Sequence, residues 1–253
     1  MSKDLSSNSQ RSGVNILGVL ATLFVSAFAF FSSQYIGVII ILIVLLALGS
    51  ERQEVVDLLS DNSLAQLVTL AVVATITIFI IYKFLKWRKF SPKKLLLLEN
   101  KPTRGMVLDV VLTYGLYFLV LIIVTVFLDI FTSVNIEQSQ DLGIADPESL
   151  GSKIIIFTML VVIPPIYEEI LFRGFLFNML KKHGGQILSV ILTSLLFGVA
   201  HLEYDNLNWI AAIDTLIFSG FLIYISQKHQ SLYSAMMLHA IKNAVAFYVL
   251  FAR

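Results

Sequence analysis

Residues 164–174 read Pro-Pro-Ile-Tyr-Glu-Glu-Ile-Leu-Phe-Arg-Gly and lie within an otherwise apolar run of membrane-spanning length. This stretch places three ionisable side chains, Glu168, Glu169 and Arg173, within six residues. Each ionisable group near the centre of a bilayer costs roughly 2.5 to 3.5 kcal/mol to insert. Three such groups indicate a compensating purpose, and chemistry is the leading one.

The composition predicts an all-α fold, a polytopic helical bundle in a membrane. The chain has 253 residues, of which 57% are hydrophobic and 14% are charged, and long runs with few charges recur along it. The net charge of +1 gives no support for nucleic-acid binding. The chain has no cysteine, which excludes disulfides, thiolate metal sites and a cysteine nucleophile.

Apolar spans of about 20 residues predict about eight transmembrane helices. Residues 13–49 carry no charge and are long enough for two helices with a turn at residues 32–34; one long tilted helix is the alternative and gives seven helices. The further predicted spans are 64–82, 106–128, 154–180, 187–202, 207–226 and 231–251.

The charges of the connecting segments predict the orientation of the bundle. Residues 83–105 carry eight Lys and Arg residues, whereas residues 129–152 carry none. Positively charged loops stay in the cytoplasm, so the first segment is predicted inside and the second outside. Lys181, Lys182 and Lys228 then lie inside, and Glu203 and Asp205 lie outside. The N-terminus is outside for eight spans and inside for seven.

Polar groups at membrane depth concentrate near the C-terminus. Eight of them fall within the last 90 residues: Glu168, Glu169, Arg173, His201, Asp214, His239, Lys242 and Asn243. The chain is therefore divided into a scaffold of transmembrane helices, residues 1–150, and a functional core, residues 151–253.

Spacing predicts that these groups meet. Glu168 lies 16 residues before Gly184, and His201 lies 16 residues after Gly185. At a rise of about 1.5 Å per residue, both are roughly 24 Å from this predicted inner turn. The same reckoning from the turn near His229 puts His239 about 15 Å and Asn243 about 20 Å deep. Spacing of four places Glu169 with Arg173, Phe197 with His201, and His239 with Asn243 on shared helix faces.

Pro164 and Pro165 predict a break or kink, with Pro165 starting a new helical segment. Glu168 and Glu169 would then lie in its first turn, where the helix dipole favours ionised carboxylates. Broken helices are tolerated at membrane depth when they line a water-filled cavity. A wet cavity and a water nucleophile follow as expectations.

Each group also has a simpler interpretation. Glu169 and Arg173 could form an ion pair that is only structural. His201 could be a histidine of the core, and His239 and Asn243 could only form hydrogen bonds between helices. Asp214 and Lys242 are predicted to form an ion pair that locks the last hairpin. The alternative is that Lys242 reaches toward the interface while Asp214 faces cavity water.

Three spaced motifs carry a resemblance to a known family. They are Glu168-Glu169-x-x-x-Arg173, Phe197-x-x-x-His201 and His239-x-x-x-Asn243, in this order on successive predicted helices. Over roughly residues 153–247 the chain resembles the CPBP family, the CAAX prenyl proteases and bacteriocin-processing enzymes also called the Abi family. Its first 150 residues carry no signature of that family.

The resemblance implies an intramembrane endopeptidase with a catalytic cavity below the cytoplasmic surface. Carried over to this chain, it implies that Glu168 and His201 activate water, that Glu169 and Arg173 hold the site together, and that His239 and Asn243 stabilise the oxyanion. Relatives are described both as metal-dependent and as glutamate proteases. His201, His239 and Glu168 could form a three-ligand site for a divalent metal such as zinc; without metal, a glutamate could act as general base.

The expected substrate is a membrane-associated peptide or a membrane-protein segment, with membrane lipids as neighbours and no nucleic acid. The short loops and modest length resemble bacterial relatives, which favours the bacterial plasma membrane and a role in peptide maturation or bacteriocin self-immunity. The alternatives are a non-catalytic immunity or scaffold protein and, less favoured, a transporter. The oligomeric state is left open.

Overall fold

The computed structural model describes residues 14–132, 144, 147, 149–202 and 209–251. Within these ranges the regular elements are helical and there is no strand, as predicted. The elements are α1 (Ile16–Ala47), α2 (Arg52–Asp61), α3 (Ser63–Trp87), α4 (Pro92–Leu95), α5 (Arg104–Phe131), α6 (Leu150–Phe157), η1 (Thr158–Val162), α7 (Ile163–Glu169), η2 (Ile170–Phe177), α8 (Asn178–Gly184), α9 (Gln186–Ala200), α10 (Trp209–His229) and α11 (Leu232–Phe251).

The expected pair of helices in residues 13–49 is wrong, because α1 runs unbroken for 32 residues. Ser32 and Ser33 do not form a turn, since their hydroxyls donate to the helix's own Phe28 and Phe30 carbonyls. Ser33 Oγ also accepts a hydrogen bond of 2.8 Å from Thr77 Oγ1 of α3. The polar residues at the middle of α1 therefore tie two helices together instead of ending one.

The count of eight spans is not confirmed. Six helical segments of the described chain are long and apolar enough to cross a membrane: α1, α3, α5, the continuous stretch Leu150–Gly184, α10 and α11. The remaining predicted span is the shorter apolar helix α9, of 15 residues. The predicted outer residues Glu203 and Asp205 lie outside the described residues.

Of the predicted break or kink at the prolines, the break is wrong. Residues 150–184 form one continuous helical segment, in which two π-helical turns, η1 and η2, flank α7. Pro164 and Pro165 lie at the beginning of α7, directly after η1. A π turn has room for an extra residue per turn, so the chain passes the prolines without a free helix end. Glu168 and Glu169 consequently lie inside a helix and not in an open first turn.

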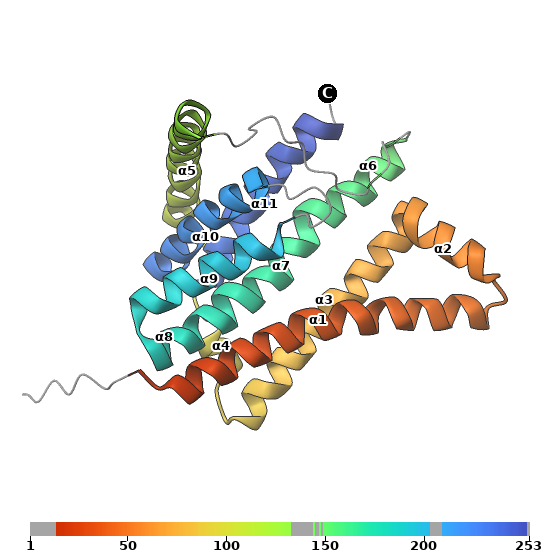
Figure 1. Cartoon of the computed structure of the whole chain (residues 1–253), viewed down its shortest axis with the longest axis horizontal. Helices are drawn as coiled ribbons and strands as arrows, with labels where there is room; N and C mark the ends of the chain where they lie inside the picture. The colour runs from red at the N-terminus through yellow and green to blue at the C-terminus, as the bar shows by residue number, and fades with distance from the viewer. Residues whose placement is uncertain (1–13, 133–143, 145–146, 148, 203–208, 252–253) are drawn as a thin grey trace, which may run out of the picture.

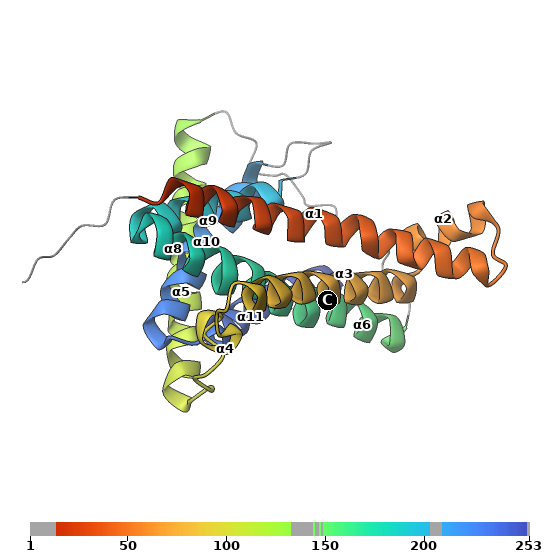
Figure 2. The same cartoon turned by 90° about the horizontal axis from the view of Figure 1, so that it is seen from below.

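The segment 150–184 lies between the other helices (Figure 1). Helices α1 and α3 cover one side of it through α7, η2 and α8, while α10 and α11 contact it on the other and α5 lies beyond them. Helices α1 and α3 run in opposite directions and cross at an angle in Figure 1, and α5 runs across both in Figure 2. The N-terminal helices thus pack directly on the helix that carries the motif residues.

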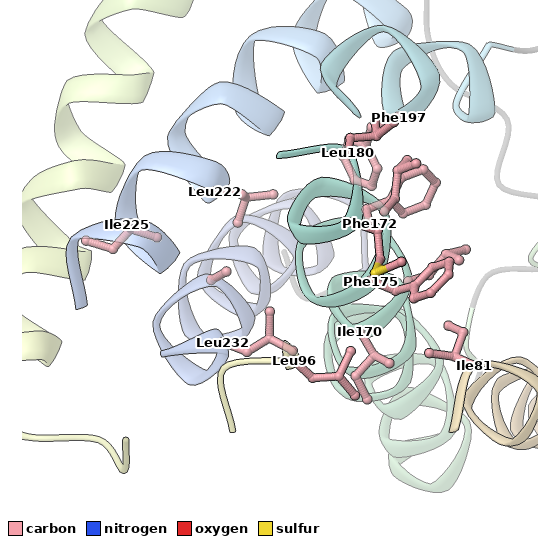
Figure 3. Packing of buried hydrophobic residues seen from close by; sticks show 14 of the residues in the cluster. Ile81, Leu96, Ile170, Phe172, Phe175, Leu180, Phe197, Leu222, Ile225 and Leu232 are labelled. Atoms are coloured by element: carbon pink, nitrogen blue, oxygen red, sulfur yellow. The ribbon is translucent and has the colours of Figure 1, made fainter. Parts of the chain in front are cut away.

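The main hydrophobic core surrounds η2 and joins side chains from most of the helices (Figure 3). Phe172 and Phe175 of η2 are almost fully buried, and Phe172 meets Phe197 of α9 edge to face, with 5.0 Å between ring centroids. Burial of aromatic side chains fixes η2 against α9, which sets the position of the residues on both.

Gly198 brings α9 and α10 into close contact. A Cβ atom at this position would lie 2.9 Å from the Ala212 carbonyl oxygen and 3.1 Å from Leu216 Cβ. Only a glycine allows two helix backbones to approach this closely. The contact places His201, which follows α9, near the first turns of α10.

Candidate active site

Glu168 and His201 face each other across a short gap. The distance from Glu168 Oε2 to His201 Nε2 is 3.9 Å, which is too long for a direct hydrogen bond. Both side chains are largely buried, with 12% and 26% of their surface exposed. Glu168 Oε2 is buried and has no hydrogen-bond partner among the described residues, so the carboxylate keeps an unused acceptor on the side of His201.

A backbone contact fixes the orientation of the His201 ring. His201 Nδ1 lies 2.9 Å from the Phe197 carbonyl oxygen, one helical turn earlier. A carbonyl can only accept, so Nδ1 carries the hydrogen and, in the neutral ring, Nε2 keeps its lone pair. That lone pair is directed toward Glu168. The predicted pairing of Phe197 and His201 on one helix face is confirmed.

Glu169, Arg173 and His239 form a buried cluster next to this pair. Arg173 Nη1 donates to Glu169 Oε1 at 3.1 Å, and His239 Nδ1 lies 2.8 Å from the same oxygen. Glu169 and Arg173 have no exposed side-chain surface. The Arg173 guanidinium also lies over the Phe197 ring, 4.0 Å from its centroid. Charge pairing and the aromatic face together offset part of the desolvation of Arg173.

Asn243 contacts a backbone carbonyl and not His239. Its Nδ2 donates to the Leu160 carbonyl oxygen at 2.8 Å. In an α-helix this oxygen would accept from residue 164, and in a π turn from residue 165; both are prolines and lack the N–H. The tandem prolines therefore create an acceptor that needs a side-chain partner, and Asn243 supplies it.

Replacing Asn243 by alanine is expected to destabilise the protein by about 1 to 3 kcal/mol, because the Leu160 carbonyl loses its donor. In a Pro164→Ala background, the restored N–H at 164 can bond to that carbonyl. The loss on adding Asn243→Ala should then be much smaller, as measured by thermal unfolding in detergent. Equal losses in the two backgrounds would contradict the proposed link between Pro164 and Asn243.

The predicted ion pair between Asp214 and Lys242 is confirmed. Lys242 Nζ lies 2.8 Å from Asp214 Oδ2, and it lies over the Phe218 ring at 4.9 Å from the centroid. A third member, not predicted from the sequence, is Tyr117 of α5, whose hydroxyl donates to Asp214 Oδ1. The three groups connect α5, α10 and α11 at the depth of the site.

Asp214→Asn alone is expected to lower stability more than the joint change Asp214→Asn, Lys242→Met. The single change leaves the ammonium of Lys242 in an apolar bundle without its counter-ion, whereas the joint change leaves no unpaired charge. Thermal unfolding of the purified variants measures both. Tyr117→Phe, which removes only the hydroxyl, should give a smaller loss than Asp214→Asn.

These groups line one cavity of about 440 Å³. Its polar lining consists of Glu168, His201, Asp214, Thr215, His239, Lys242 and Asn243, and its apolar lining includes Leu160, Pro164, Phe197, Ala211, Phe218 and Leu250. Four of the six predicted site residues therefore share a cavity. The other two, Glu169 and Arg173, lie behind it and contact it through His239.

The suggested metal ligands are Glu168, His201 and His239. Both histidines engage Nδ1 with an oxygen acceptor, as metal-ligating histidines commonly do. However, no group of three or more His, Asp or Glu side chains in the described ranges is arranged to hold a metal ion. The arrangement therefore does not fit a three-ligand metal centre.

Comparison with protein families adds independent information. Residues 150–245 match the family described as Rce1-like, type II CAAX prenyl endopeptidase. This region is an Rce1-like domain of the CPBP and CAAX protease family. The domain contains the three motifs and most of the residues that line the cavity, and its limits confirm the resemblance seen over residues 153–247. No curated protein and no solved structure matched the chain.

The match of residues 150–245 to a membrane protease family, together with six long apolar helices in the described ranges, makes the chain an integral multi-pass membrane protein. The match begins at α6 and ends within α11. Helices α1 to α5 lie outside it, although Tyr117 of α5 hydrogen-bonds to a residue that lines the cavity.

Proposed function

We propose that the chain is an intramembrane endopeptidase in which Glu168 and His201 activate the attacking water. The observation that carries this proposal is the facing pair itself, a carboxylate oxygen and an imidazole lone pair 3.9 Å apart at the wall of a cavity. A water between them has two acceptors for its hydrogens. General-base catalysis of this kind needs both groups within hydrogen-bonding reach of the reacting water.

In the proposed reaction, the water oxygen attacks the carbonyl carbon of a peptide bond while Glu168 accepts a proton. The tetrahedral intermediate carries a negative oxygen, which needs donors fixed in place beforehand. Asn243 Nδ2 has a second hydrogen beyond the one given to Leu160. His239, whose Nδ1 contacts Glu169, lines the same cavity and is proposed as the second group at the oxyanion. Glu168 then returns the proton to the leaving nitrogen as the C–N bond breaks.

Glu169 and Arg173 are proposed as supports for the site. Glu169 holds His239 through Nδ1, and Arg173 holds Glu169 and packs on the Phe197 ring. Neither residue lines the cavity. Their proposed effect is therefore to orient the groups that contact the substrate.

The proposed substrate is a membrane-associated peptide or a segment of a membrane protein, cut in peptide maturation or in bacteriocin self-immunity in a bacterial plasma membrane. The family resemblance implies a cavity near the cytoplasmic side. The loop charges place residues 83–105 on that side, yet Ala211 and Leu250 of the lining belong to the opposite helix ends. Entry of the substrate sideways from the membrane agrees both with the cavity position that the family resemblance implies and with the position of Ala211 and Leu250. We therefore favour a membrane-embedded substrate.

The proposal is tested by comparing the membrane proteome of cells that carry the active protein with that of cells carrying Glu168→Gln. New peptide termini that appear only with the active protein identify the substrate and support the proposal. If the termini are the same in both cells while a protective phenotype persists, the chain acts as a non-catalytic immunity or scaffold protein.

Cleavage is expected to survive the removal of divalent metal, because the described site residues form no three-ligand set. The measurement is elemental analysis of purified protein together with peptide cleavage after chelation. About one equivalent of zinc per chain, and loss of cleavage that added zinc restores, would instead assign His201, His239 and Glu168 as ligands.

A further inference from the structure

A second cavity of about 450 Å³ lies outside the catalytic site, between the beginning of α1, the end of α3 and α8. Its lining has a polar part, Asn15, Thr22, Arg88 and His183, and an apolar part, Leu17, Ala21, Phe84, Trp87 and Met179. These helix ends lie together at one end of the molecule in Figures 1 and 2. The catalytic mechanism uses none of these residues.

The polar wall is fixed by direct contacts between α1 and α8. The Asn15 backbone N–H donates to the His183 carbonyl oxygen at 2.8 Å, and the Asn15 side chain accepts from the Gly18 N–H at 2.9 Å. The His183 ring lies directly against Gly18, where an added Cβ would come within 2.4 Å of Nδ1. The ring occupies space that a side chain at position 18 would fill, so His183 is held at the cavity wall.

The charge at this cavity has one sign. Arg88 lines it, Lys182 is next to the lining residue His183, and no Asp or Glu is among the lining residues. The N-terminal end of the 32-residue helix α1 adds its positive dipole. Positive side chains and the positive end of a helix repel one another when they surround one space. An anion bound between them removes this repulsion.

The apolar part indicates what the anion is attached to. Leu17 is 80% exposed and Trp87 is 74% exposed, so the cavity is continuous with the apolar outer surface. Tryptophan and arginine are frequent at the interface between lipid tails and headgroups. The loop charges place this end of the bundle at the cytoplasmic leaflet, where anionic lipids concentrate.

We propose that this cavity binds the phosphate headgroup of an anionic phospholipid, with Arg88 and His183 contacting the phosphate and an acyl chain lying along Leu17 and Phe84. The bound lipid joins α1 and α3 to α8. Because α8 continues the helix that carries Glu168, Glu169 and Arg173, lipid binding stabilises the segment that holds the site. The proposal does not depend on peptidase activity.

The test measures thermal unfolding of the purified full chain in detergent while phosphatidylglycerol, phosphatidylcholine or inorganic phosphate is added. The unfolding temperature should rise with phosphatidylglycerol and stay nearly constant with phosphatidylcholine. Arg88→Gln should weaken the response to phosphatidylglycerol about fivefold, as expected for loss of one basic contact to an anionic headgroup, and His183→Gln should weaken it less, because it removes only a polar contact.

Lys86→Gln is the matched control, because Lys86 is exposed on the same helix, carries the same charge as Arg88 and does not line the cavity. An equal loss in Lys86→Gln and Arg88→Gln would show general attraction to a charged surface and overturn the site. A rise with inorganic phosphate as large as that with phosphatidylglycerol would assign the cavity to a free anion and overturn the lipid.

Discussion

Glu168→Gln and His201→Ala are each expected to reduce peptide cleavage by about 10²- to 10⁴-fold, the usual contribution of a general base. Glutamine keeps the size of Glu168 but cannot accept the proton, and alanine removes the lone pair that faces Glu168 at 3.9 Å. Initial rates on the peptide identified from the proteome comparison provide the measurement.

The double change should cost little more than either single one, because two residues that act on one water behave as a unit. Multiplied losses would contradict the shared water. Glu99→Gln serves as the matched control, since Glu99 is exposed and lies between α4 and α5, outside the cavity lining. Unfolding temperatures near that of the unmodified protein would show that the losses concern chemistry.

Glu169→Gln is expected to lower the free energy of unfolding by about 3 to 5 kcal/mol, the usual cost of removing one partner of a buried ion pair. The change leaves Arg173 fully buried with no carboxylate and weakens the bond to His239. Thermal unfolding in detergent, compared with that of the unmodified protein, measures the effect.

The joint change Glu169→Gln, Arg173→Met should be less destabilising than Glu169→Gln alone, since no buried charge is left. Cleavage should nevertheless stay low in the joint variant, because His239 has lost the carboxylate that orients it. A joint variant that is as unstable as the single one would show that Glu169 does not stabilise the protein by pairing with Arg173.

Much of the site could be predicted from spacing because helices impose fixed periods. Residues four apart share a face, which predicted the contacts of Glu169 with Arg173 and of Phe197 with His201. Equal distance from a turn placed Glu168 near His201, and the same argument paired Asp214 with Lys242. Their catalytic roles stay predictions.

Contacts that depend on irregular backbone could not be predicted in this way. The bond from Asn243 to the Leu160 carbonyl exists because a π turn and two prolines leave that oxygen without a donor. Periodicity does not show where a π turn falls. The contact of Tyr117 could not be predicted, because its partner lies on another helix and the sequence around a tyrosine in an apolar helix does not show which helix that is.

The fold was predicted in class but not in the number of helices. Ser32, Ser33 and Pro164 predict interruptions of a helix, but the helices continue through all three. The serine hydroxyls form hydrogen bonds within α1, and the π turn η1 precedes the prolines without ending the helical segment. In an apolar solvent an open backbone is costly, so a helix tolerates residues that would end it in water.

The close approach of α9 and α10 at Gly198 determines which wall of the cavity can move. Two helices whose backbones nearly touch have no side-chain layer between them on which to slide. We therefore expect α9 and α10 to move together and to carry His201 and Asp214 with them. The opposite wall, α11, is joined to its neighbours by the polar contacts of Lys242 with Asp214 and of Asn243 with Leu160, and by the apolar contact of Phe247 with Ile156 and Val161. The two polar contacts can be exchanged for contacts with water or with a peptide backbone, so we expect the cavity to widen along α11 when a substrate enters, while α9 and α10 stay in place at Gly198.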